Sequence, residues 1–75
     1  MSPASAAALL ASCPTAKSAL EASIKAHDAN RHDLGDALFA HASILRMSGY
    51  PVARASLIGQ RDALLAASPE PEGTP

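Results

Sequence analysis

The segment from Leu20 to Leu45 decides the fold, and it reads LEASIKAHDANRHDLGDALFAHASIL. Eight of its residues recur at alternating steps of four and three, and we call them the central stripe: Leu20, Ile24, His27, Arg31, Leu34, Leu38, His41 and Leu45. This spacing places the eight side chains along one side of a helix that packs against another helix. Because the stripe keeps its phase through the polar residues 30–33, it favours one long helix over about residues 16–47.

The alternative is a break in this helix at residues 29–33. Asn30 and Gly35 are both weak helix formers, and Asp33 is a residue type that can cap a new helix. The two interpretations differ at Gly35. In an unbroken helix, Gly35→Ala is expected to stabilise the protein by up to about 1 kcal/mol, because Ala loses less backbone entropy than Gly.

Shorter helices are predicted on both sides of the central segment. Ser2 and Pro3 are typical of a helix start, and Pro14 interrupts the short helix that follows. Residues 48–51 combine a helix-ending Gly with a helix-starting Pro, so we expect a returning helix over about residues 51–67.

The fold class that follows is all-α. A turn as short as residues 48–50 forces the returning helix to fold back on the long helix, which gives an antiparallel helical hairpin preceded by a short N-terminal helix. The single helical domain is expected over residues 1–67. Residues 68–75 are rich in Pro and Glu, have little to bury, and predict a disordered tail.

The composition indicates a thin core and a protein partner. Apolar residues make up 48% of the 75 residues, but the chain has one Phe, one Tyr and no Trp, so large side chains contribute little burial. A domain this small gains stability by binding another protein, which we expect to be helical, or a second copy of itself.

Charge and cysteine content narrow the function classes. The formal net charge is −1, whereas nucleic-acid-binding domains are usually strongly basic, so we do not expect nucleic acid as the partner. The chain start has no export signal, and its apolar residues are too few for a membrane span, so no membrane partner is expected. Cys13 is the one cysteine, which excludes an internal disulfide and fits a cytoplasmic protein.

No residue pattern in the chain predicts catalysis. His27 and His41 share the central stripe but stand about 21 Å apart along a helix, so they cannot bind one metal ion. Asp28 and His32 are four residues apart, yet they supply two ligands without a third. We therefore predict no enzyme activity, no catalytic residue, no metal site and no cofactor. The roles of the three histidines and of Cys13 stay open.

A partner-binding face is predicted on the returning helix. Arg54 and Arg61 are seven residues apart and lie on one side of it, among apolar side chains. Cations set among apolar residues are typical of a surface that binds an acidic partner. The predicted face comprises Arg54, Leu57, Ile58, Arg61, Leu64 and Leu65. The alternative is that both arginines sit at the edge of the hairpin contact and reach water.

A second function class is a DNA-binding regulator. The stretch Leu45 to Pro51 and the helix after it fit a helix-turn-helix, with Gly49 in the turn. The near-neutral charge and the few side chains able to read base edges argue against this class.

The same stretch carries a family resemblance. The expected order of a short leading helix, a long helix, a Gly-containing turn and a shorter returning helix resembles the YscE-type needle chaperones of type III secretion. The matching stretch is residues 45–51, followed by Leu57, Gln60, Ala63 and Leu64. The match covers about half of the chain and excludes the Ala-rich start, the histidines and the tail. The resemblance implies a small cytosolic helical hairpin that helps a larger helical-repeat chaperone hold the needle subunit before export.

The register of the central stripe predicts the order of two mutational effects. At about 100° per residue, Leu38 lies about 40° from Leu34 around the helix, whereas Phe39 lies about 140° away. Leu38→Ala should therefore lower the urea midpoint more than Phe39→Ala. The opposite order of midpoints would mean that the register is wrong.

Overall fold

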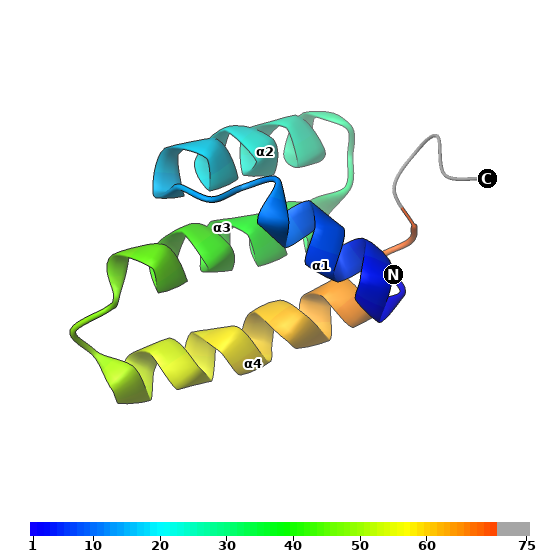
Figure 1. Ribbon diagram of the computed structural model, residues 1–75. Coiled ribbons are helices and arrows are strands. Elements are labelled where there is room, and N and C mark those ends of the chain that lie inside the picture. Colours follow the sequence, from blue (N-terminus) through cyan, green and yellow to red (C-terminus); the bar gives the residue numbers. More distant parts are fainter. Residues whose placement is uncertain (71–75) are drawn as a thin grey trace.

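The computed structural model describes residues 1–70, whose regular structure is entirely helical (Figure 1). The four helices are α1 (Pro3–Ala11), α2 (Ala16–Asp28), α3 (His32–Arg46) and α4 (Pro51–Ala67). The predicted all-α class is confirmed, together with the short N-terminal helix and the returning helix over residues 51–67. In Figure 1, α2, α3 and α4 run side by side in alternating directions, and α1 crosses near one end.

The first two helices begin where side chains cap them. The Ser2 hydroxyl accepts a hydrogen bond from the Ser5 N–H, and Pro3 is the first residue of α1. At α2, Thr15 and Ser18 form a reciprocal capping box, in which each side chain accepts from the other residue's backbone N–H. These bonds satisfy N–H groups that have no partner inside the helix.

The single long helix over residues 16–47 is wrong, because the chain reverses at Asn30. This residue has a φ of 62°, the left-handed region that Asn tolerates better than most side chains do. The Arg31 N–H donates to the carbonyl of Ala26 at 2.8 Å, and the Asn30 N–H donates to that of His27 at 2.9 Å. Together these bonds form a Schellman motif, which ends α2 and turns the chain.

The predicted break at 29–33 is therefore the correct alternative, but its capping residue differs. Helix α3 begins at His32 rather than after Asp33, and Arg31 precedes it with no side-chain cap. Asp33 lies in the first turn of α3, where its charge is favourable beside the helix N-terminus.

Only the middle of the central stripe is buried, and its last residue, Leu45, is 39% exposed. Leu34, Leu38 and His41 of α3 are buried, whereas Ile24 of α2 is 61% exposed. Helix α2 instead buries small residues, each one position before a residue of the stripe: Ala19, Ser23 and Ala26. These small side chains let α2 lie close to α3. The Ser23 hydroxyl donates to the Gly35 carbonyl at 2.6 Å in the buried contact.

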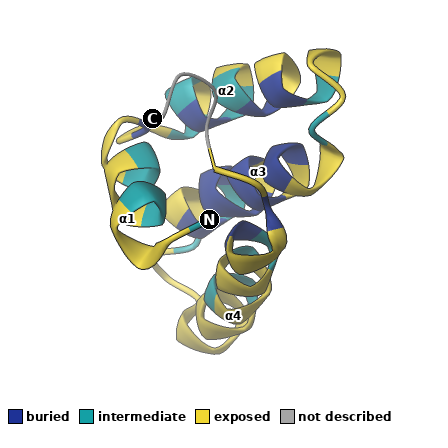
Figure 2. Cartoon of the chain, turned by 90° about the vertical axis from the view of Figure 1, so that its right-hand side faces the viewer, coloured by how far each residue is buried: buried dark blue, intermediate teal, exposed yellow. Residues whose placement is uncertain are grey.

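Helix α3 is the centre of the molecule, with buried residues along most of its length (Figure 2). It packs against α2 on one side and α4 on the other, while Leu9 and Leu10 of α1 pack against the same core. Leu38 is 1% exposed and Phe39 is 58% exposed, so the predicted register of this helix is confirmed.

The chain after α4 contacts the helices as far as the structure describes it. The Ser68 hydroxyl donates to the Leu64 carbonyl at 2.8 Å, and the Arg31 guanidinium donates to the Pro69 carbonyl at 3.1 Å. Hydrogen bonds from the Ser5 side chain and the Ser2 N–H lower the pKa of the Glu70 carboxyl. Of the predicted disordered tail over residues 68–75, residues 71–75 lie outside the described residues.

The close approach of α2 and α3 changes the expectation for Gly35→Ala. A Cβ on Gly35 would lie within 3.0 Å of three atoms of the His27 ring, so this ring must move outward. We expect the full gain of about 1 kcal/mol only in a His27→Ala background, and a clearly smaller gain or a loss in the parent chain. Urea unfolding of the four proteins of this double-mutant cycle measures the difference. Equal effects in both backgrounds would show that the ring does not restrict residue 35.

Candidate functional site

The face predicted on the returning helix is turned largely toward the helical body. Leu65 is buried in the core, and Leu57, Ile58 and Leu64 are half-buried. Arg61 is also largely covered, whereas Arg54 in the first turn is exposed. The structure thus brings the four apolar residues together on the inner side of α4. It places the two arginines differently, because Arg61 lies against the helical body and Arg54 lies in solvent.

Arg61 takes part in a hydrogen-bonded link between three parts of the chain. Its guanidinium lies 3.3 Å from Nδ1 of the buried His41, and Nε2 of His41 lies 3.0 Å from the carbonyl oxygen of Cys13. A guanidinium can only donate and a carbonyl can only accept, so in this link Nδ1 of His41 accepts and Nε2 donates. This link joins the α1–α2 connection, α3 and α4.

The opposite side of α4 is an uncharged surface. Its exposed residues recur at steps of four and three, and we call them the outer face of α4: Val52, Ser56, Gly59, Ala63 and Ala66. None is charged, and all are small or medium-sized. The exposed turns of α4 project from the molecule in Figure 2, and among the described residues α4 packs mainly against α3 and, to a smaller extent, against α1.

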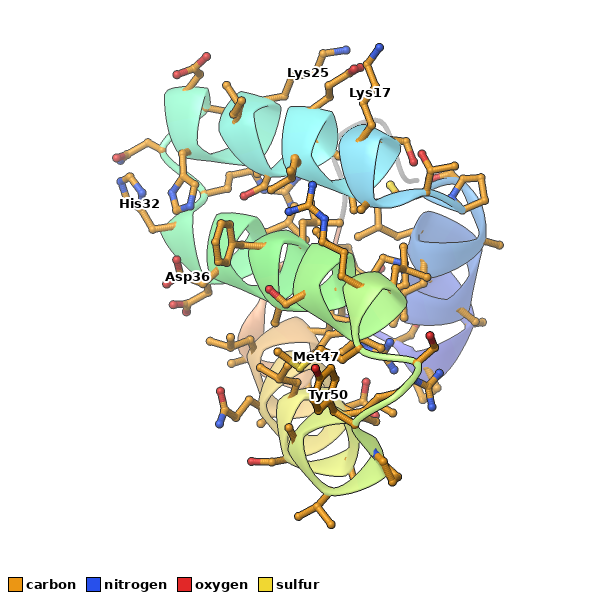
Figure 3. All side chains as sticks on the ribbon, turned by 90° about the vertical axis from the view of Figure 1, so that its left-hand side faces the viewer. Lys17, Lys25, His32, Asp36, Met47 and Tyr50 are labelled. Atoms are coloured by element: carbon orange, nitrogen blue, oxygen red, sulfur yellow. The ribbon has the colours of Figure 1, made fainter. Side chains whose placement is uncertain are left out.

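An apolar groove adjoins the start of this face. It has a volume of about 500 Å³ and is lined by Gly49, Tyr50, Pro51, Val52, Ala53 and Ser56. Tyr50 and Val52 are 66% and 84% exposed, which is unusual for large apolar side chains. Figure 3 shows Tyr50 beside Met47 at the turn between α3 and α4. The sequence predicts a turn here but does not predict that Tyr50 and Val52 form an exposed apolar cluster.

The described residues offer little chemistry elsewhere. Among residues 1–70, no three His, Cys, Asp or Glu side chains converge on a point where they could hold a metal ion. Cys13 is buried and unpaired. No helix in the same range is both long and apolar enough to cross a bilayer. The turn at Asn30 does bring His27 and His32 together, which their five-residue spacing does not predict for a continuous helix.

Comparison with known proteins adds no relative: no family model, no curated protein and no solved structure matches this chain. The function therefore has to be inferred from the residues and their geometry.

The two arginines of α4 should behave differently when their charge is reversed. Arg61→Glu removes the donor to Nδ1 of His41 and leaves a largely buried acceptor unpaired, so we expect a loss of about 1–3 kcal/mol in the free energy of unfolding. Arg54→Glu changes an exposed side chain and should stay within about 0.5 kcal/mol of the parent. Urea unfolding of the two variants provides a matched comparison. Equal losses would show that the contact to His41 contributes nothing.

Proposed function

We propose that the protein is a small protein-binding module, acting as a co-chaperone or adaptor, and that the outer face of α4 is its docking surface. The proposal rests on the small fraction of α4 that is buried. This helix has 17 residues and buries only Leu65, while an uncharged stripe and two large apolar side chains at its start are left in solvent. Exposed apolar surface of this kind is typical of protein-interaction sites.

The occupant that fits this surface is a helix of another protein. Small side chains such as Gly59 and Ala63 let a second helix approach closely, because the distance between packed helices depends on the side chains at their contact. The groove at Tyr50 and Val52 offers an apolar pocket for a large side chain at the end of that helix. Aromatic anchors near such a pocket often supply most of the binding energy.

The surface is poorly suited to DNA. A recognition helix presents cations and amides to the phosphates and base edges, but the outer face of α4 carries neither Lys nor Arg. Arg61 is engaged with His41 inside the molecule. The helix-turn-helix alternative is therefore the weaker of the two proposals.

A cytoplasmic location belongs to the same proposal, and the unpaired, buried thiol of Cys13 is consistent with it. A role in type III secretion rests on the resemblance of residues 45–51 and the following helix alone. The break at Asn30 departs from the long helix which that resemblance implies.

The test captures a partner from native lysate with the parent chain and identifies it by mass spectrometry. The affinity of the purified partner is then measured for the parent and for the variant chains. Ala63→Glu places a charge in the centre of the outer face of α4, where burying it against a partner is costly. We expect it to weaken binding of the partner at least tenfold while the circular dichroism spectrum stays helical.

The matched control is Ala8→Glu, the same substitution at an exposed position of α1. It should bind the partner as the parent does. Undiminished binding by Ala63→Glu would remove this face from the proposal. Light scattering of the parent chain measures its molecular mass and shows whether a second copy of the chain, rather than another protein, is the partner.

A further inference from the structure

Two histidines meet end to end at the α2–α3 turn. Nδ1 of His27, at the end of α2, lies 2.8 Å from Nδ1 of His32, at the start of α3. The ring centroids are 5.1 Å apart, so each ring directs its Nδ1 at the other. Both rings are accessible, because His32 is exposed and His27 is partly exposed.

The outer nitrogens of both rings face oxygen acceptors. Nε2 of His32 lies 2.9 Å from Oδ1 of Asn30, and Nε2 of His27 lies 3.5 Å from Oδ1 of Asp36. An amide oxygen and a carboxylate accept hydrogen bonds, so each Nε2 is favoured as the N–H. Figure 3 shows His32 and Asp36 together at this edge of the molecule.

This arrangement directs the two Nδ1 atoms toward each other, so that they share one hydrogen when either ring carries it on Nδ1. When both Nε2 atoms carry hydrogen, each neutral ring has a bare Nδ1, and two bare nitrogens 2.8 Å apart repel unless a cation lies between or beside them. A single proton is one such cation, and a divalent metal ion is the other. Histidines that bind metals commonly donate their second N–H to a carboxylate or another oxygen; His32 has such a partner in Asn30, and the Asp36 carboxylate lies 3.5 Å from the corresponding atom of His27.

We propose that His27 and His32 together bind a divalent transition-metal ion through their Nδ1 atoms, with Asp36 and Asn30 orienting the two rings. The ion belongs to the Ni²⁺ and Cu²⁺ class. Imidazole nitrogens suit both ions, and Cu²⁺ stands highest in the affinity order of the divalent first-row metals. The exposed His32 ring turns so that the lone pairs of both Nδ1 atoms converge on the ion. The hydrogen that the two rings share leaves to solvent as a proton. Water fills the remaining coordination positions of the ion.

Such an ion would connect two helices. His27 belongs to α2 and His32 to α3, and the intervening turn depends on the left-handed Asn30. Binding to the folded state alone stabilises it by mass action, so the melting temperature should rise with the concentration of free metal. This inference is independent of the proposed docking surface, which lies on α4 and shares no residue with the histidine pair.

The test is titration of the full chain with Ni²⁺ by isothermal calorimetry, alongside thermal unfolding at each concentration. We expect one ion per chain and a rising melting temperature. His32→Gln alters an exposed side chain, so the fold should be kept, and it should weaken Ni²⁺ binding at least tenfold and abolish the thermal shift.

Two carboxylates in the first turns of α3 supply a matched pair of controls. Asp36→Asn removes the acceptor at His27 and should weaken Ni²⁺ binding about tenfold, whereas Asp33→Asn makes the same charge change without that contact and should bind as the parent does. Equal affinity of His32→Gln and the parent would place the ion elsewhere in the chain and overturn the proposal. So would the absence of binding at millimolar Ni²⁺, which would leave a proton as the cation between the rings.

Discussion

The close approach of α2 to α3 is the constraint on which the rest of the structure depends. Ala19, Ser23 and Ala26 leave little side chain between the two helices, and Gly35 offers none. The Ser23 hydroxyl is buried in this contact. It donates a hydrogen bond to the Gly35 carbonyl, so the close approach does not leave the hydroxyl without a partner. A chain with so few large apolar residues obtains packing density from short distances between helices rather than from bulky side chains.

The remaining helices are held by polar contacts as much as by apolar burial. His41 reaches from α3 to the Cys13 carbonyl and to the Arg61 guanidinium, so one ring positions the α1–α2 connection and α4 against the central helix. Both nitrogens of the buried ring are paired, which removes the penalty of placing it in the core. Because Arg61 and the apolar inner side of α4 are used in this way, the surface available to a partner is the outer face of this helix.

The two proposed sites therefore have different structural origins. The outer face of α4 is a regular helical surface that lacks a neighbouring helix, and its spacing can be read directly from residues 52–66. The histidine pair has no such periodic signal, because it is created by the turn at Asn30. His27 and His32 would point in different directions on a continuous helix, since five residues correspond to about 500°, or 140° beyond a full turn.

The sequence by itself determined the helical class, the start of α1 at Ser2 and Pro3, the bounds of α4 and the register of α3. These features depend on local signals, namely caps, prolines, glycines and the phase of apolar residues within one helix. It did not determine which residues of the central stripe are buried, because Ile24 and Leu38 fit the same period while only tertiary packing selects Leu38 for the core. The break at Asn30 was decided by the tertiary structure too, since the hydrogen bonds of the turn and the packing of small residues on α3 together outweigh the continuity of the pattern.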